Sequence, residues 1–137
     1  MGKRLLVIDD EPGVANVIAL VAGGLGFVVR VVNCPIRAID AFIDFRPDLV
    51  ILDMIMPEKD GIDVLNELLL TGLGCRIVLT SGLSEAYLRL AEGIARFHAS
   101  EVAVLRKPFR RQELVNVLVP TEQQKPWRAS QWLALSA

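Results

Sequence analysis

Short apolar runs alternate along the chain with longer segments in which apolar residues recur every three or four positions. The short runs occupy residues 4–9, 27–32, 48–54, 76–81 and 102–105, and the longer segments occupy 13–23, 35–45, 60–70, 85–99 and 110–118. A continuous apolar run is typical of a buried strand, and a period near 3.6 is typical of a helix. Five strands that alternate with five helices predict an α/β protein, in which a parallel sheet is covered by helices on both faces.

Several residues mark where these elements begin and end. The glycines at 23, 24 and 26 end the first helix, Pro35 lies in the first turn of the second, and Asp60 is predicted to cap the third. The Gly24-x-Gly26 spacing precedes a strand and does not follow one, so it does not indicate a dinucleotide-binding loop. The run 48–54 is apolar at almost every position, which indicates a central strand that is buried on both faces.

The pattern changes after Val119. Pro120 breaks the last helix and the next residues are polar, so we predict one domain over 1–119 and a linker-like tail over 120–137. The end of the tail contains Trp127 and Trp132, and it forms either a short amphipathic helix or an unstructured terminus.

Composition narrows the function classes. A length of 137 residues suits a single domain, and an apolar content of 53% with only 6% aromatic residues predicts an aliphatic core. The formal net charge of −1 and the lack of a recognisable DNA-binding module argue against direct binding of nucleic acid. Cys34, Cys75 and the lone His98 do not have the spacing of a zinc site or a disulfide framework. Without a leader-like segment or a membrane-length apolar run, we expect a soluble, cytoplasmic protein with no membrane partner.

Polar residues that can take part in chemistry lie at the ends of four of the predicted strands or directly after them. They are the acidic residues Asp9, Asp10 and Glu11, then Asp53, then Thr80 and Ser81, and finally Lys107. The carboxyl ends of parallel strands lie at one edge of a sheet, which is where α/β proteins bind their ligands. Clustered carboxylates repel one another unless a cation joins them, and hard oxygen ligands suit Mg²⁺. A carboxylate in such a site can also serve as a nucleophile toward phosphorus.

At this point the sequence resembles a response regulator receiver domain of bacterial two-component signalling, of the chemotaxis-regulator type. The resemblance extends over about residues 3–119 and depends on "VIDDE" at 7–11, "LDMIMPEKDG" at 52–61, "TSG" at 80–82 and "RKPF" at 106–109. It implies a flavodoxin-like, doubly wound sheet with strand order 2-1-3-4-5. It also implies a phosphoacceptor switch, not a conventional enzyme, that receives its phosphoryl group from a sensor histidine kinase and acts on an output protein or domain.

The resemblance assigns a role to each matching residue. Asp53 matches the phosphoacceptor, Asp10 a direct ligand of Mg²⁺ or Mn²⁺, and Asp9 a ligand that acts through metal-bound water. Ile55 would offer its backbone carbonyl to the metal. Lys107 would pair first with the Asp53 carboxylate and then with the phosphoryl group. The resemblance also implies a cis peptide bond between Lys107 and Pro108. Ser81 matches the switch hydroxyl; Thr80 competes for that role, but Ser81 followed by glycine fits the family pattern better.

The sequence departs from the family at one position that bears on switching. Many receivers have Tyr or Phe three residues before the lysine, where this chain has Val104. The switch would then change the surface of the fourth helix, fifth strand and fifth helix by another route. An alternative is that the fold serves as an interaction or dimerisation module with little phosphorylation. A hydrolase with an aspartyl-phosphate intermediate is disfavoured, because such enzymes place a second aspartate where this chain has Ile55.

Overall fold

The computed structural model describes residues 2–82, 85–98 and 100–121, and the predicted tail with Trp127 and Trp132 lies outside them. In chain order the elements are β1 (Arg4–Ile8), α1 (Pro12–Gly24), β2 (Val28–Val32), the 3₁₀ turn η1 (Pro35–Arg37), α2 (Ala38–Phe45), β3 (Leu49–Asp53), β4 (Ile55–Met56), β5 (Lys59–Asp60), α3 (Gly61–Leu70), β6 (Arg76–Ser81), α4 (Glu85–Phe97), β7 (Val102–Arg106) and α5 (Arg111–Leu118). Each predicted strand and helix is present, and its ends lie within a few residues of the expected ones.

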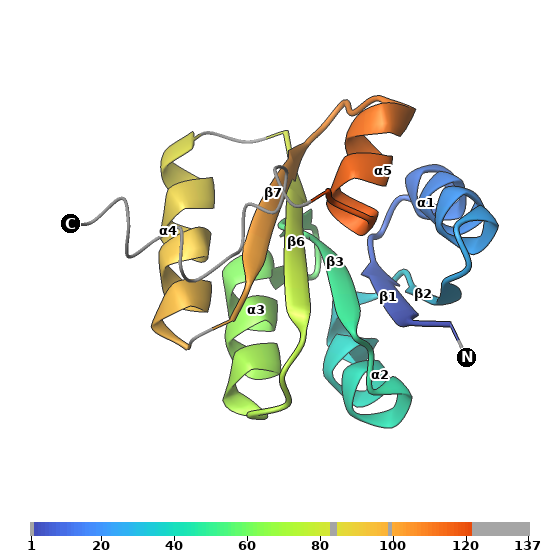
Figure 1. The fold of residues 1–137 in the computed structure, drawn as a ribbon. Helices are drawn as coiled ribbons and strands as arrows, with labels where there is room; N and C mark the ends of the chain where they lie inside the picture. Colours follow the sequence, from blue (N-terminus) through green and yellow to red (C-terminus); the bar gives the residue numbers. More distant parts are fainter. Residues whose placement is uncertain (1, 83–84, 99, 122–137) are drawn as a thin grey trace.

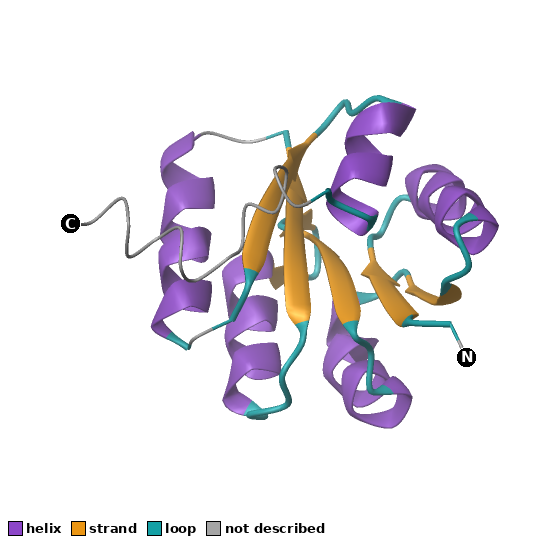
Figure 2. Cartoon of the chain, in the orientation of Figure 1, coloured by secondary structure: helices purple, strands orange, loops and turns teal. Residues whose placement is uncertain are grey.

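The five long strands form one parallel sheet in the order β2-β1-β3-β6-β7. This is the predicted order 2-1-3-4-5 once the short β4–β5 hairpin is set aside. The helices cover both faces of the sheet: α1 and α5 lie on one side, and α2, α3 and α4 lie on the other (Figure 1). Figure 2 shows the same arrangement as a layer of strands between two layers of helices.

Alternate residues of the central strands supply the two halves of the core. Leu6 and Ile8 of β1 belong to the cluster under α2, α3 and α4, whereas Leu5 and Val7 belong to the cluster under α1 and α5. All five residues of β3 are buried, as the apolar run predicted for a central strand. Phe42 of α2 is the largest fully buried side chain, so the core is almost entirely aliphatic.

The β4–β5 hairpin was not predicted. It pairs Ile55 with Asp60 and Met56 with Lys59 immediately after β3, and it leads directly into α3. The side chain of Asp60 then accepts a hydrogen bond of 2.8 Å from the amide of Ile62, which confirms Asp60 as the helix cap. The hairpin therefore connects the end of β3 to the start of α3 through a short, hydrogen-bonded segment.

Gly61, the first residue of α3, packs against the backbone of Met54. A Cβ atom at this position would lie 2.5 Å from the Met54 Cα, a distance that side chains do not tolerate. Only glycine lets the helix start approach the strand end this closely. The residue directly after Asp53 is thus held from one side by the backbone of α3.

Within the part of the chain that the structure describes, none of the helices has the length and apolarity needed to cross a lipid bilayer.

Candidate phosphorylation site

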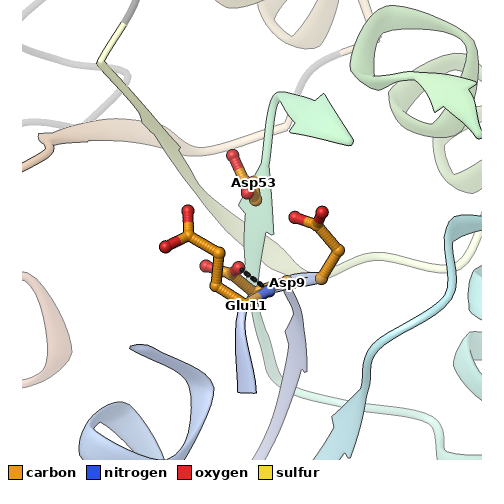
Figure 3. Close-up of side chains that lie close together, drawn as sticks. Asp9, Glu11 and Asp53 are labelled. Atoms are coloured by element: carbon orange, nitrogen blue, oxygen red, sulfur yellow. Dashed lines mark hydrogen bonds between the residues drawn. The ribbon is translucent and has the colours of Figure 1, made fainter. Parts of the chain in front are cut away.

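The strand ends bring the predicted polar residues to one edge of the sheet. Asp53 is the last residue of β3, Asp9 directly follows β1, and Lys107 directly follows β7. Figure 3 shows the side chains of Asp9, Glu11 and Asp53 gathered at this edge. Asp9 and Asp53 are nearly inaccessible to solvent, with exposed fractions of 0% and 2%, so the centre of the cluster is enclosed.

Lys107 occupies the middle of the acidic cluster. Its Nζ atom lies 3.0 Å from an Asp9 oxygen, 3.2 Å from an Asp53 oxygen and 3.3 Å from a Glu11 oxygen. The peptide bond from Lys107 to Pro108 is cis, as the resemblance to the family implied. One ammonium group therefore serves three carboxylates from two different strand ends.

Backbone amides fix the orientation of two of these carboxylates. The amide of Glu11 donates to Asp9 Oδ1 at 2.9 Å, the bond drawn as a dashed line in Figure 3. In the same way the amide of Ile55 donates to Asp53 Oδ1 at 3.1 Å. Each carboxylate thus has one oxygen held by its own loop, and the Oδ2 atoms of Asp9 and Asp53 face Lys107.

The pKa values of Asp53 and Lys107 show how burial and neighbouring charges compete in this site. Burial raises the pKa of Asp53 from 3.8 to about 6, and the charge of Asp9 adds to the rise, while the Ile55 amide and Lys107 oppose it. Burial by itself lowers the pKa of Lys107, but the hydrogen bond to Asp9 and the charges of Asp53 and Asp9 outweigh it, so the pKa is raised. Lys107 stays charged at neutral pH, and even so it does not offset the cost of burying Asp53 as an anion.

The donor set fits a divalent cation. Asp9, Asp10, Glu11 and Asp53 can each present a carboxylate oxygen, and these four atoms lie within 4.8 Å of one another. Oxygen ligands with two buried and two accessible members match a hard cation that retains some of its water, as Mg²⁺ does. A second cation would also relieve the excess of negative charge that keeps the pKa of Asp53 high.

The structure places the two candidate hydroxyl residues differently. Thr80 pairs with Asp53 in the β3–β6 ladder, and its Oγ1 is buried without a hydrogen-bond partner among the described residues. Ser81 is one residue farther along β6, at the strand end, and is 1% exposed. It pairs with Arg106, the residue before Lys107. Both therefore adjoin the site, and the preference for Ser81 as the switch hydroxyl stays a prediction.

Ile55 lies in β4, two residues from Asp53, and its amide orients the Asp53 carboxylate. That contact is a role that the sequence did not assign to it, whereas the contact of its carbonyl with a metal stays a prediction. The sequence also did not assign a role to Glu11, which the structure brings into the acidic cluster. Its position directly after Asp9 and Asp10 had placed it among the polar residues expected at this edge, but without a role of its own.

Comparison with known proteins agrees with the fold. A sequence profile described as "Response regulator receiver domain" matches residues 5–119. The DNA-binding response regulator MtrA of Mycolicibacterium smegmatis is 32% identical over 115 residues, which are 84% of this chain and 48% of that protein. This chain thus spans about half the length of that relative.

Solved structures give the same result. The receiver domain of a response regulator from Bermanella marisrubri is 28% identical, with a TM-score of 0.74 over 86% of this chain and 96% of the other. A CheY-like receiver domain protein from Methanospirillum hungatei has a TM-score of 0.75 over 86% of this chain and 91% of its own, at 14% identity. The second likeness concerns the fold alone.

Proposed function

The chain belongs to the response regulator receiver family, whose members are phosphoacceptor switches of two-component signalling, and we propose that Asp53 is the residue that accepts the phosphoryl group. The observation that supports this proposal best is the placement of Lys107 Nζ, 3.2 Å from Asp53 Oδ2, inside a cluster of four carboxylates that suits a divalent cation. Asp9 is equally buried and also contacts Lys107, but it belongs to the acidic motif after β1 that matches the metal ligands, whereas Asp53 is the last residue of the central strand β3 and matches the phosphoacceptor.

The charge state of Asp53 suits a nucleophile. With a pKa of about 6, most of the carboxylate is ionised at pH 7, and yet its negative charge is poorly stabilised by its surroundings. Because the Ile55 amide holds Oδ1, the Oδ2 atom that faces Lys107 is the oxygen placed to attack. Attack on the phosphohistidine of a sensor kinase forms the Oδ2–P bond and breaks the P–N bond, and the leaving imidazole takes up a proton.

Asp9, Asp10 and Asp53 are the residues that would hold Mg²⁺ or Mn²⁺, with Glu11 close by and the carbonyl of Ile55 as a further ligand. The cation supplies neutralisation of the charge on the transferring phosphoryl oxygens. In the protein's own chemistry, Lys107 exchanges its carboxylate partners for a phosphoryl oxygen. Ser81 donates its hydroxyl to another oxygen and moves toward it, which biases the surface of α4, β7 and α5 between two states.

The partners follow from this role. A sensor histidine kinase is the proposed phosphodonor, and the product is a signalling state, not a released metabolite, so the chain is not a conventional enzyme. The output partner is a separate protein or a further domain. The relative MtrA, of which this chain covers 48%, is named as a DNA-binding response regulator. The expectation of no direct nucleic-acid partner therefore stays a prediction.

Incubation with acetyl phosphate and Mg²⁺, followed by intact-mass measurement, tests the assignment. We expect one phosphoryl group on the wild-type chain and none after chelation of the metal. Asp53→Asn should abolish labelling, whereas Asp63→Asn, which changes an exposed aspartate of α3, should not. Equal labelling of the Asp53→Asn variant would exclude Asp53. A wild-type chain that is never labelled would instead favour an interaction or dimerisation module.

A further inference from the structure

Tyr87, in the first turn of α4, reaches across to the segment that follows Asp53. Its hydroxyl donates to the Asp60 carboxylate at 2.6 Å and lies 3.4 Å from the Met54 carbonyl oxygen. Met54 is the next residue after Asp53, and Asp60 ends the β4–β5 hairpin. The first turn of α4 is thus connected by one side chain to both ends of the segment between β3 and α3.

The chemistry of this contact favours a persistent bond. Burial, the Asp60 hydrogen bond and the Asp60 charge raise the pKa of Tyr87 to about 12, so the hydroxyl stays protonated and continues to donate at neutral pH. A hydrogen bond to a charged acceptor is stronger than one between neutral groups. Asp60 is itself fixed, because the same Oδ1 atom accepts the amide of Ile62 at the start of α3.

A second contact joins the same turn of α4 to the other side of the site. Glu85, the first residue of α4, forms an ion pair with Arg106, which directly precedes Lys107. Both side chains are about half exposed, so this pair contributes little to stability. It nevertheless shows that the first turn of α4 lies between the residue after Asp53 and the residue before Lys107. Figure 1 shows α4 beside α3, on the same face of the sheet.

Val104 and Tyr87 pack against the same core cluster beneath α4. The Val104 side chain has no polar atom, so it cannot form or break a hydrogen bond when Ser81 moves. Tyr87 has one, and Ser81 closely precedes α4 in the chain. Among the side chains described at this face, the Tyr87 hydroxyl is therefore the group best placed to couple α4 to Asp53.

We propose that Tyr87 is a positioning residue that holds the first turn of α4 to Met54 and Asp60 in the unphosphorylated protein, and that this contact breaks when Asp53 is phosphorylated. The inference rests on the proposed function of Asp53. If Ser81 moves toward a phosphoryl oxygen, the start of α4 moves relative to Met54, which is confined by Gly61. Hydrogen bonds of this geometry do not survive a displacement of about 1 Å. The contact then favours only one of the two states, and its removal must favour the other.

Beryllofluoride, an analogue of the phosphoryl group, provides the test with the full 137-residue chain. Beryllium is titrated in the presence of fluoride and Mg²⁺, and binding is followed by the amide resonances of β6. Tyr87→Phe keeps the ring and removes the hydroxyl, so we expect half-saturation at a beryllium concentration about three- to tenfold lower than for the wild type. Phe97→Leu, at an exposed aromatic residue in the last turn of α4, should leave the value unchanged.

Asp60→Asn supplies a second variant that keeps an acceptor for the Ile62 amide and removes the charge that strengthens the Tyr87 bond. It should shift half-saturation in the same direction by a smaller factor, and it decides the question if Tyr87→Phe does not fold. Hydrogen exchange adds an independent measurement. In the absence of beryllofluoride, the α4 amides of Tyr87→Phe should exchange about as fast as the α4 amides of the wild type to which beryllofluoride is bound.

Unchanged or weaker beryllofluoride binding by Tyr87→Phe would overturn the inference and leave Asp53 as the phosphoacceptor. Loss of general stability alone would not tighten binding, so a purely structural role predicts the wrong sign. If the wild-type chain does not bind beryllofluoride at all, the proposed function itself fails and this inference fails with it.

Discussion

Asp53 should destabilise the metal-free protein at neutral pH, although it is the centre of the site. Its pKa of about 6, against 3.8 in the unfolded chain, means that ionising the carboxylate costs about 3 kcal/mol more in the folded state. Asp53→Asn removes that charge and leaves Lys107 paired with Asp9 and Glu11. We therefore expect the variant to be more stable than the wild type by about 1–3 kcal/mol at pH 7.5 in a chelating buffer.

The pH dependence has a definite sign. A carboxyl whose pKa is higher in the folded state binds more protons there, so its contribution to stability is lost as pH rises from about 4 to about 6. Relative to Asp53→Asn, the wild type should lose stability over that window, and the two proteins should become similar below it. Because the other carboxyl groups are common to both proteins, their contributions cancel in the comparison.

Urea unfolding followed by circular dichroism, at several pH values and in EDTA, measures both quantities. Asp63→Asn serves as the matched control, because its side chain lies on the exposed side of α3 and should change stability by no more than a few tenths of a kcal/mol. A less stable Asp53→Asn variant at pH 7.5, or a difference that did not change with pH, would refute the account of the buried charge.

Three further changes have expected outcomes. At a Mg²⁺ concentration 100 times the dissociation constant, the metal should stabilise the wild type by about 2.7 kcal/mol in a thermal-melt titration. Asp10→Asn should remove most of that gain, and equal gains in the two proteins would exclude Asp10 as a ligand. Lys107→Met should lower the rate of labelling by acetyl phosphate at least about tenfold while the circular dichroism spectrum stays unchanged, and undiminished labelling would contradict its role. Gly61→Ala should lower the free energy of unfolding by about 2 kcal/mol or more, because the new Cβ atom would clash with the Met54 backbone. Gly13→Ala is the control: its Cβ atom meets nothing within 4 Å, so it should be neutral or stabilising by about 0.5 kcal/mol. The reverse order would show that the start of α3 is not tightly packed.

The sheet could be predicted because its signals are local and repeated. The first four residues of β3 are apolar and buried, and Asp60 caps α3 as its place before a helical pattern indicated. The order of the strands needed the resemblance, since alternation alone leaves several parallel orders open. The hairpin at Ile55–Met56 and Lys59–Asp60 had no alternating pattern long enough to indicate it, because each strand has only two residues.

The site was predictable as a set of residues but not as a set of contacts. Asp9, Asp53 and Lys107 could be expected to meet, because each follows a parallel strand. That Lys107 would also reach Glu11 depends on the path of the chain between β1 and α1, which no sequence period encodes. The Tyr87–Asp60 contact was not anticipated either, because it joins two helix starts that are distant in sequence.

The direct measurement of the central claim is the chemical identity of the phosphorylated residue. After labelling with acetyl phosphate and Mg²⁺, reduction with borohydride converts an aspartyl phosphate to homoserine, which peptide sequencing by mass spectrometry locates. The account predicts homoserine at position 53 and no reduced side chain at any other aspartate or glutamate. Homoserine at Asp9, Asp10 or another aspartate, with Asp53 unmodified, would contradict it.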